Sequence, residues 1–415
     1  MSSADLVIVG AGAAGLMAAI WAGRTARRLH LSRRIVVLDG ANKLGAKILV
    51  AGGGRCNVTH DHVSEQAYAG SSRNAIKKVL RRFDVTPTVA FFNELGVKLK
   101  REETGKLFPV TDDAHTVLDA LLRAAADAQV TFKHPARVEA ISRGETGFHV
   151  RGAWGELTAP RLILATGGKS LPKSGSDGVG YELAKSLGHT LTPHIFPALV
   201  PLRLPSDHFL CALSGLTVNA VLMLYAGAGK ELVSFTDSTL CTHFGLSGPS
   251  VLDFSRYYTA ARFDDPAAHA AINWLPDTTT ERLEADLLQA GKRSILRWLD
   301  GRLPERLLRA LCAEAGVEAG MPLQELTRDQ RKQLTRVLTR LPLPITGDRG
   351  YNYAEVTAGG IPLTDIRLET MESRLCPGLH YCGEICDVDG RIGGYNFQWA
   401  WASGYVAGQA AIDSA

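Results

Sequence analysis

The chain has 415 residues, of which 46% are hydrophobic and 21% charged, and its formal net charge is +4. This length exceeds the size at which one hydrophobic core usually stops growing, so we expect two or three globular domains. Seven cysteines at irregular spacing favour a reducing cytoplasm over a disulfide framework. No apolar run is long enough to span a bilayer, and the apolar start lacks a basic leader segment, so a cytoplasmic protein without a membrane partner is expected.

A glycine-rich turn stands between an apolar run and a helix near the start of the sequence. The apolar run is Leu6–Val9, and the motif Gly10-Ala-Gly-Ala-Ala-Gly15 leads into small residues as far as Gly23. Gly10 permits a tight turn, Gly12 lets the backbone approach a pyrophosphate, and Gly15 allows the helix to pack closely on the strand. The pattern therefore predicts a dinucleotide cradle.

A second predicted strand follows the cradle and ends in a carboxylate. The run Ile35–Leu38 is apolar, and Asp39 comes directly after it. In a βαβ unit an acidic side chain at this place can accept a hydrogen bond from a ribose hydroxyl. The complete pattern predicts dinucleotide binding more strongly than the glycine motif alone. Residues 45–57, which follow, are expected to form a loop.

Two basic runs stand out against the near-neutral balance of the whole chain. Residues 24–34 hold five arginines and no acid, and residues 73–82 hold five lysines or arginines and no acid. Solvated helix faces are the simpler interpretation of such runs. A footprint for a phosphate backbone is the alternative.

The remaining pattern predicts an α/β domain that is interrupted and then resumed. The elements expected before residue 190 are helices at about 71–83 and 114–128 and strands at 137–142 and 161–165. Short strand-like runs such as 216–225 then indicate an inserted β domain, and a largely helical segment follows it. The predicted division is a dinucleotide-binding domain at 1–190, a β domain at 191–278, a helical domain at 279–340 and a return to the first domain at 341–415.

Two C-terminal segments favour FAD over NAD as the dinucleotide. Gly378–Glu384 is an apolar strand whose terminal carboxylate can accept hydrogen bonds from ribityl hydroxyls. Gly393–Gly404 is a glycine turn that opens a helix, and the N-terminus of this helix can stabilise negative charge on a reduced flavin ring. Trp399 and Trp401 of this helix are expected to pack in the core rather than on the flavin.

Other cofactors and redox classes are disfavoured. Gly175–Gly180 does not directly follow a strand, so no second nicotinamide-binding domain is predicted. NAD(P)H is therefore expected as a transient reductant, and another electron donor is the alternative. Cys382 and Cys386 lie in the wrong element for a flavin–disulfide reductase. The spacing of cysteines and histidines predicts no metal site.

Four motifs together resemble the BaiN/YhiN-like family of FAD-dependent oxidoreductases, and the resemblance spans nearly the whole chain. They lie at residues 45–57, 242–249, 356–360 and 393–401. The resemblance implies an α/β fold with a two-dinucleotide-binding, Rossmann-like FAD domain, an inserted β-barrel domain and a helical domain. It also implies reduction of a carbon–carbon double bond. Some members are linked to dihydrouridine in large-subunit ribosomal RNA, and others to unsaturated bile-acid intermediates.

The resemblance further implies which residues contact FAD. Ala14 and Gly15 would lie at the pyrophosphate with the other cradle glycines, Asp39 at the adenosine ribose, and Val138 would offer its backbone to adenine. The flavin-proximal segment would contribute Lys47, Gly53, Gly54 and Asn57. The rest of the cofactor would be lined by Thr166, Gly167, Glu384, Gly394 and Phe397. Arg391 stands where many members carry proline, so the turn before Gly393 departs from the family pattern.

Reduction of a double bond needs a proton donor beside the flavin as well as a hydride. Cys56 is one candidate, because the cation of the preceding Arg55 would favour its thiolate and place its pKa near neutrality. His243, before a Gly-Leu-Ser-Gly turn, is the other candidate. A packed loop cysteine and a structural histidine are the alternative interpretations.

Three functions remain open, and the first is favoured. It is reduction of uridine in ribosomal RNA, with the basic runs and the helical domain holding phosphates. The second is an ene-reductase or amine oxidase acting on a free metabolite in an enclosed apolar pocket. The third is a non-catalytic flavin-binding redox module. The sequence indicates neither the oligomeric state nor the identity of the substrate.

Overall fold

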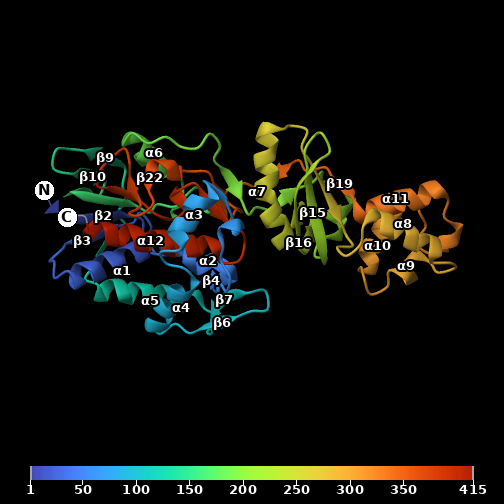
Figure 1. The fold of residues 1–415 in the computed structure, drawn as a ribbon, viewed down its shortest axis with the longest axis horizontal. Helices are drawn as coiled ribbons and strands as arrows, with labels where there is room; N and C mark the ends of the chain where they lie inside the picture. The colour runs from blue at the N-terminus through green and yellow to red at the C-terminus, as the bar shows by residue number, and fades with distance from the viewer. Residues whose placement is uncertain (1, 414–415) are drawn as a thin grey trace. The chain divides into compact units, whose positions relative to one another are not determined.

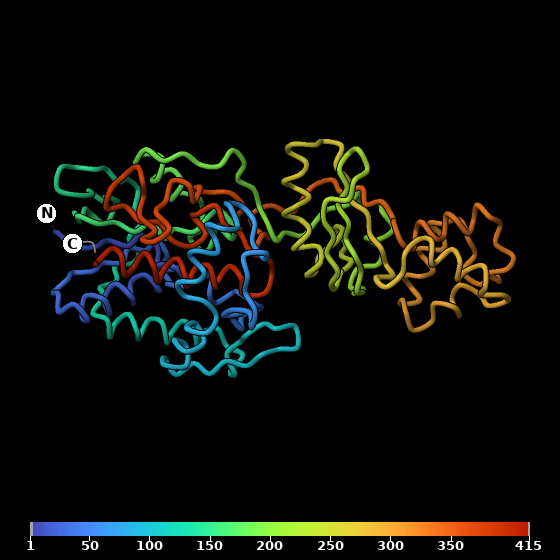
Figure 2. Tube along the Cα trace, in the orientation of Figure 1, coloured from blue at the N-terminus to red at the C-terminus, as the bar shows by residue number. Residues whose placement is uncertain are grey.

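The computed structural model describes residues 2–413, which form two units (Figure 1). Unit 1 combines residues up to 197 with residues from 355 onward, and unit 2 is the continuous segment 198–354. The first and last parts of the chain therefore build one unit together, as the blue and red segments of the tube in Figure 2 show.

Unit 1 is built on a seven-stranded sheet with the order β22-β23-β24-β12-β2-β3-β8. Its five strands from β24 to β8 are parallel, and β22 and β23 pair antiparallel at one edge. The strands are β2 (Leu6–Val9), β3 (Ile35–Leu38), β8 (Thr131–Lys133), β12 (Arg161–Leu164), β22 (Ile366–Arg367), β23 (Glu372–Ser373) and β24 (Leu379–Tyr381). All side chains of β2 and β3 are buried. A parallel sheet covered on both faces explains why these strands are continuous apolar runs.

Helices and smaller sheets surround the central sheet of unit 1. The helices are α1 (Ala13–Arg28), α2 (Ala46–Gly54), α3 (Arg73–Leu80), α4 (Val85–Glu94), α5 (Ala114–Asp127), α6 (Val179–Ser186) and α12 (Tyr395–Asp413), with 3₁₀ turns η1 (Glu65–Ala67), η2 (Pro172–Ser174), η5 (Leu363–Asp365) and η6 (Gly383–Ile385). The smaller sheets contain β1 (Ser2–Ser3), β9 (Ala140–Arg143), β10 (Phe148–Gly152) and β11 (Gly155–Ala159); β4 (Thr59–His60), β6 (Leu99–Arg101) and β7 (Lys106–Pro109); β5 (Tyr68–Gly70) and β25 (Val388–Gly390); and β13 (Phe196–Ala198) and β21 (Val356–Ala358).

Unit 2 contains a seven-stranded sheet followed in sequence by a group of helices. The sheet order is β19-β18-β15-β16-β17-β14-β20, and its pairs are antiparallel. The strands are β14 (Leu202–Arg203), β15 (Thr217–Tyr225), β16 (Glu231–Thr242), β17 (Gly245–Ser247), β18 (His269–Asn273), β19 (Leu341–Leu343) and β20 (Gly347–Asp348). The helices are α7 (Pro249–Asp264), α8 (Thr280–Gln289), α9 (Ile295–Trp298), α10 (Glu305–Glu314) and α11 (Arg328–Thr339), with 3₁₀ turns η3 (Phe209–Leu213) and η4 (Leu323–Glu325).

Three details differ from the sequence-based expectations. Strand β9 begins at Ala140 rather than at residue 137, and the segment before it is held at the end of β3, where Ala136 N donates to Asp39 O. The two edge strands β19 and β20 of the described sheet do not pair, so the sheet is open rather than a closed barrel. Both strands belong to unit 2, so the return to the first domain, predicted at residue 341, comes too early. The division into a β domain and a helical domain within unit 2 stays a prediction.

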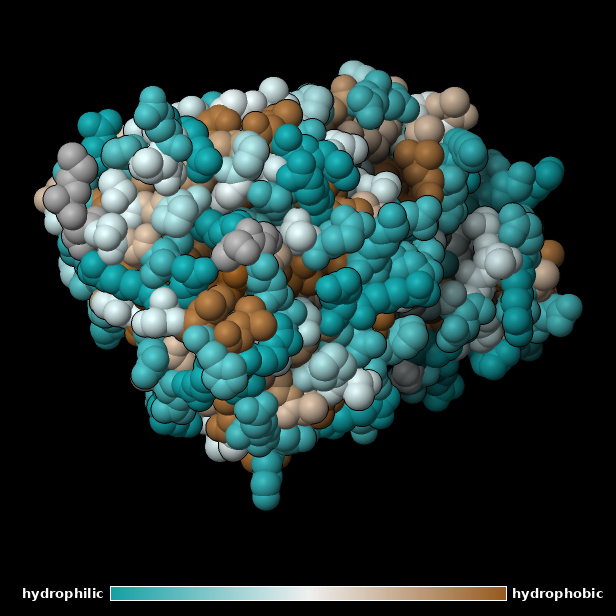
Figure 3. All heavy atoms as spheres, turned by 60° about the vertical axis from the view of Figure 1, so that its left-hand side comes forward, coloured by the Kyte–Doolittle hydropathy of each residue, from teal (hydrophilic) through white to brown (hydrophobic). Residues whose placement is uncertain are grey.

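The described residues contain neither a membrane-spanning helix nor a cluster of side chains that could hold a metal ion. On the face that Figure 3 presents, hydrophilic residues predominate and hydrophobic residues form smaller groups between them. Among residues 2–413, no helix combines the length and the apolar character needed to cross a bilayer. The same residues contain no group of three or more histidine, cysteine, aspartate or glutamate side chains arranged to hold a metal ion.

Candidate cofactor site

The glycine turn after β2 forms an open cradle at the N-terminus of α1. Gly10 has φ +103°, and a Cβ atom there would lie 2.5 Å from the carbonyl oxygen of Ala165. A Cβ on Gly15 would collide with the carbonyl oxygen of Gly10. A Cβ on Gly12, by contrast, would meet no atom within 4 Å, and no side chain caps the helix that Gly12 begins. The helix N-terminus thus faces free space, which fits a pyrophosphate.

Asp39 holds this cradle together from the end of β3. Its Oδ2 accepts a hydrogen bond from Ala11 N at 2.6 Å, and its Oδ1 accepts one from Ala41 N at 2.7 Å. The bond between Ala136 N and Asp39 O brings the buried Val138 segment to the same edge of the sheet. The structure therefore gathers the predicted pyrophosphate, ribose and adenine positions, and it gives Asp39 a structural role besides the proposed ribose contact.

Two buried hydroxyls beyond β12 have no protein partner among the described residues. They are Thr166 Oγ1 and Ser176 Oγ. Gly167, with φ +71°, follows Thr166 in sequence and lies next to Ser176, because a Cβ on it would be 2.7 Å from Ser176 Oγ. Buried polar groups are almost always hydrogen-bonded in folded proteins. Two unsatisfied hydroxyls in this segment therefore indicate a polar ligand at this place, and Asn57 Oδ1 is another of the unsatisfied buried polar atoms of unit 1.

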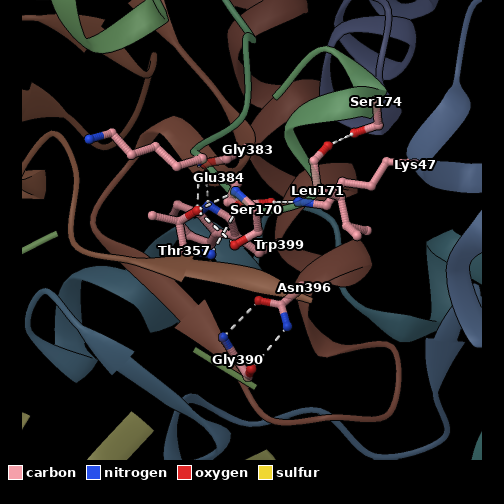
Figure 4. A network of polar contacts seen from close by, with 11 residues as sticks. Lys47, Ser170, Leu171, Ser174, Thr357, Gly383, Glu384, Gly390, Asn396 and Trp399 are labelled. Atoms are coloured by element: carbon pink, nitrogen blue, oxygen red, sulfur yellow. Dashed lines mark hydrogen bonds and ion pairs between the residues drawn. The ribbon is translucent and has the colours of Figure 1, made fainter. Parts of the chain in front are cut away.

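Lys47 and Glu384, far apart in sequence, form an ion pair (Figure 4). Glu384 Oε2 is the partner of Lys47 Nζ, and its Oε1 accepts from Thr357 N at 3.0 Å. The hydroxyl of Thr357 accepts from Lys169 N at 2.7 Å and from Ser170 N at 3.0 Å. Glu384 therefore lies in a polar network that joins α2, η6, β21 and the segment after β12.

Thr357 was not singled out from the sequence, although it is central to this network. It is buried, and its hydroxyl and amide connect the segment after β12 to Glu384. The available signal was a polar residue inside the otherwise apolar motif Val356-Thr-Ala-Gly-Gly360. Ser176 was likewise passed over, because its glycine-rich segment was interpreted only as a loop.

The predicted loop at residues 45–57 is largely the kinked helix α2. Its start, Ala46-Lys-Ile-Leu-Val50, is helical, and the glycines that follow break the helix with φ +59° at Gly52 and +71° at Gly53. A Cβ on Gly53 would meet no atom within 4 Å, so the backbone here faces open space. Gly54 also has a positive φ, and Asn57 is buried directly after the turn.

The proposed reactivity of Cys56 rests on a premise that the structure contradicts. Cys56 is completely buried, and burial raises the pKa of its thiol to about 12. The guanidinium of Arg55 is engaged elsewhere, 2.6 Å from Glu102 and 3.7 Å from Asp112, and lies over the ring of Phe108. The prediction that Arg55 lowers the pKa of Cys56 is therefore wrong.

His243 lies in unit 2, whereas every residue proposed to bind the cofactor lies in unit 1. It is exposed in the turn between β16 and β17, and its ring contacts Phe244 edge-on at a centroid distance of 5.1 Å. Its proposed role in protonation stays a prediction.

The glycine turn before α12 packs against β4. A Cβ on Gly394, which has φ +94°, would lie 2.6 Å from the backbone of Thr59. Phe397 stacks on Trp401 with centroids 5.4 Å apart, and Trp401 Nε1 donates to Val58 O at 2.8 Å. Trp399 Nε1 donates to Gly383 O at 3.0 Å (Figure 4), which confirms core packing for both tryptophans.

A histidine that the sequence did not single out lies beside the same turn. His60 ends β4, and its ring stacks on Tyr395 with centroids 5.0 Å apart. Its Nε2 is 2.9 Å from Thr104 O, and its Nδ1 is 2.9 Å from Asp61 Oδ1. The hydrogen bond from Arg101 lowers the pKa of Asp61, so the neighbour of His60 is a carboxylate at neutral pH. The available signal was its place directly after the Arg-Cys-Asn-Val-Thr segment.

Comparison with known proteins identifies the family. The family described as the HI0933-like protein Rossmann domain matches residues 4–410. A 3-dehydro-bile acid delta(4,6)-reductase of Clostridium scindens is 33% identical over 410 residues, which are 98% of each chain. A ribosomal RNA dihydrouridine synthase of Escherichia coli is 34% identical over 99% of this chain and 98% of its own length. The enzyme of the same name from Haemophilus influenzae is 32% identical over 96% of each chain.

The family match and the names of these relatives support an FAD oxidoreductase, and the fold is the mixed α/β architecture that was predicted. The open cradle, the unsatisfied hydroxyls and the Lys47–Glu384 pair fit the chemistry of that cofactor. The chain therefore belongs to the HI0933-like family, and unit 1 contains its Rossmann-type FAD-binding domain.

Proposed function

We propose that this protein reduces a carbon–carbon double bond with FAD as its cofactor, and that its substrate is a uridine of large-subunit ribosomal RNA. The observation that carries the proposal is identity of 34% and 32%, over nearly whole chains, to two ribosomal RNA dihydrouridine synthases. Dihydrouridine differs from uridine by two hydrogens added across one double bond. The name of the bile-acid relative also denotes a reductase of double bonds, so both kinds of relative support the same chemistry.

The residues of unit 1 are proposed to bind and orient the cofactor. The cradle of Gly10, Gly12, Ala14 and Gly15 would hold the pyrophosphate, with Asp39 at the ribose and Val138 at adenine. Lys47, Gly53, Gly54, Asn57, Thr166, Gly167, Glu384, Gly394 and Phe397 would surround the remainder. Bound reduced FAD supplies the hydride for such a reduction.

The Lys47–Glu384 pair is proposed to fix polar groups beside the flavin. Both side chains are mostly buried, with 26% and 17% of their surfaces exposed, so neither is free to move into solvent without losing its partner. A cation held at this place can stabilise negative charge that develops on a reduced ring. The pair would therefore tune the reactivity of the cofactor.

Reduction of the double bond also consumes a proton, and the chain must deliver it to the second carbon. Cys56 is a poor donor at neutral pH because burial holds its proton tightly. His243 and His60 are the remaining candidates, and His60 has its ring beside the glycine turn of unit 1. A uridine in a base-paired helix would have to be extruded to reach such a site.

The test is a reaction with purified protein, FAD, and large-subunit ribosomal RNA from cells that lack this protein. NADH and NADPH are compared as reductants under anaerobic conditions, and the spectrum of the flavin reports its reduction and reoxidation. Reoxidation by the RNA, with dihydrouridine found by mass spectrometry of the nucleosides, is the expected result. Reoxidation by an unsaturated bile acid but not by RNA would instead support the second function, a reductase of a free metabolite.

The histidine candidates are separated in the same assay. A His60→Asn or His243→Asn variant that lacks the proton donor should be reduced by NAD(P)H at the parent rate but reoxidised by RNA more slowly, by about 100-fold. The matched control is His115→Asn, since His115 is exposed at the start of α5. Equal slowing of both half-reactions would indicate a damaged cofactor site instead of a lost proton donor.

A further inference from the structure

Helix α11 carries a row of four cations along one side. The basic row consists of Arg328, Lys332, Arg336 and Arg340, spaced four residues apart from the first helical residue to the C-cap. All four side chains are exposed. The opposite side of α11 is buried through Leu334, Val337 and Leu338. The row therefore faces away from the core of unit 2.

No member of the basic row forms an ion pair within the described residues, whereas some cations on neighbouring helices do. Among the described residues, none of its members has a carboxylate oxygen within 4 Å, and Arg340 lies over the ring of Tyr225 at 4.3 Å. On neighbouring helices of unit 2, Arg282 pairs with Asp286 and Arg309 pairs with Glu305, each across one helical turn. The basic row therefore carries its charge without an acidic partner among the described residues.

The stability of the helix does not account for the basic row. Like charges four residues apart repel each other on a helix, and Arg328 in the first turn opposes the helix dipole, whereas Arg336 in the last turn complements it. A capping box formed by Thr327 and Gln330 and the buried leucines hold α11 in place despite this repulsion. Three repulsive pairs in succession therefore indicate an external anion as the partner.

We propose that the basic row binds the phosphodiester backbone of an RNA. Four residues of α-helix rise about 6 Å, so the row presents cations at regular intervals over about 18 Å. Such an array suits a chain of phosphates, each of which carries one negative charge. An anionic membrane is the less suitable partner, because α11 exposes no large hydrophobic side chain that could enter the lipid.

The inference rests on the proposed RNA substrate and assigns a second contact surface to it. A base must leave its stack to reach a flavin, whereas backbone contacts elsewhere can hold the RNA without reading its sequence. The basic row would supply this sequence-independent affinity. The basic run at residues 24–34 is less suitable, because Arg24, Arg28 and Arg33 already pair with Glu94, Asp413 and Asp5.

The test replaces all four members of the row by glutamine, which removes the charges and keeps helix propensity. The matched control removes four charges from ion pairs in the substitutions Arg28→Gln, Lys185→Gln, Arg282→Gln and Arg309→Gln. Binding of a fragment of large-subunit ribosomal RNA to the full chain loaded with FAD is measured by fluorescence anisotropy at several salt concentrations.

We expect the row variant to bind RNA about 100-fold more weakly at about 0.1 M salt. Its slope of log affinity against log salt should be shallower than that of the parent by about 3, because each lost phosphate contact removes about 0.7. The control should retain the parent slope within about 1. The inference would be overturned if the row variant had the same salt slope as the parent protein. It would also be overturned if the control variant lost as much RNA affinity as the row variant.

Two further measurements distinguish loss of the RNA contact from misfolding of the variant and from binding of a different polyanion. If the glutamine variant loses flavin or helix content, a variant with lysine in place of Arg328, Arg336 and Arg340 must retain the parent slope, and loss of that slope would overturn the inference. Vesicles with phosphatidylglycerol and a polyglutamate peptide serve as alternative partners, and a row-dependent loss confined to either would also overturn it. RNA binding that depends on the row without formation of dihydrouridine would contradict the proposed reaction but not the RNA contact.

Discussion

Gly12 and Gly15 lie three residues apart in one motif, but the structure assigns them different tasks. A side chain on Gly12 would point into open space, whereas a side chain on Gly15 would collide with the carbonyl oxygen of Gly10. Gly15 is therefore required for the fold, whereas Gly12 is free of such constraint and is proposed to serve the ligand. The sequence motif alone could indicate both roles, because the strand and helix around it fix the geometry.

The substitution Gly12→Asp should remove FAD without unfolding the protein. The new carboxylate would lie in the cradle and repel the pyrophosphate, while no protein atom obstructs it. Flavin absorbance per chain should fall to near zero, with an unchanged far-ultraviolet circular dichroism spectrum. Gly15→Ala is the contrasting variant and should lower the free energy of unfolding by about 1–3 kcal/mol. An FAD-loaded Gly12→Asp protein would contradict the proposed cradle.

His380 should make the fold sensitive to mild acid. It is completely buried in β24, its Nδ1 lies 2.9 Å from Thr370 O, and burial lowers the pKa of its side chain to about 4. Because this pKa is below that of the unfolded chain, the unfolded state takes up the proton first as the pH falls. Stability is thus retained above about pH 6.5 and lost toward pH 4, by about 2 kcal/mol between pH 7 and pH 5.

Urea unfolding of the parent and of His380→Asn at several pH values measures this effect. The variant keeps a donor for Thr370 O but cannot titrate, so its stability should change less between pH 7 and pH 5. Burial also lowers the pKa of His189, which should leave a smaller dependence in the variant. Parallel pH curves for both proteins would rule out His380 as the cause.

Cys56 shows where inference from neighbouring residues in sequence fails. The adjacent Arg55 suggested a reactive thiolate, but its guanidinium turns to Glu102 and Asp112, and the thiol enters the core. The pKa of a side chain depends on how deeply it is buried and on which charged groups point toward it. Neither of these follows from the fact that two residues are adjacent in sequence.

At the scale of elements, helix α12 is tied to distant segments through the amide of Gln398. Its Oε1 accepts from Thr59 Oγ1 at 2.7 Å, and its Nε2 donates to Phe83 O at 2.8 Å and to Thr88 Oγ1 at 3.0 Å. The side chain is completely buried. This one amide therefore connects α12 to β4, to the segment after α3 and to α4.

The substitution Gln398→Met should lower the free energy of unfolding by about 2–4 kcal/mol. Methionine fills a similar volume but leaves Thr59, Thr88 and Phe83 O without this partner in the core. Gln333→Met on the exposed side of α11 is the control and should change stability by less than about 0.5 kcal/mol. Urea unfolding measures both, and equal effects would show that the buried network is not important for stability.

The regular elements of the sheet could be predicted because their signal is local. The apolar runs at Leu6–Val9 and Ile35–Leu38 coincide with β2 and β3, and the run at 216–225 corresponds closely to β15. The kinked helix α2 was missed because three glycines mask the five helical residues Ala46–Val50 before them. The pairing of β19 and β20 with the sheet of unit 2 was missed because it depends on contacts distant in sequence.

At the scale of the whole molecule, the discontinuity of unit 1 was the most informative prediction from the sequence. The return of glycine-rich apolar segments indicated that the C-terminal part completes the first sheet, and β24 indeed pairs with β12. The contacts of Glu384 with Lys47 and Thr357 could not be predicted, because they depend on the relative positions of three chain segments. Lys47 and Glu384 are 337 residues apart in sequence.

The most direct test of the central claim is the amount of dihydrouridine in large-subunit ribosomal RNA from a strain that lacks this protein. The deletion is complemented either by the parent chain or by the Gly12→Asp variant, at equal protein levels. Our account predicts that dihydrouridine is lost at one site in the deletion strain and restored by the parent only. Unchanged dihydrouridine in the deletion strain would contradict the proposed RNA substrate and direct the search to a free unsaturated metabolite.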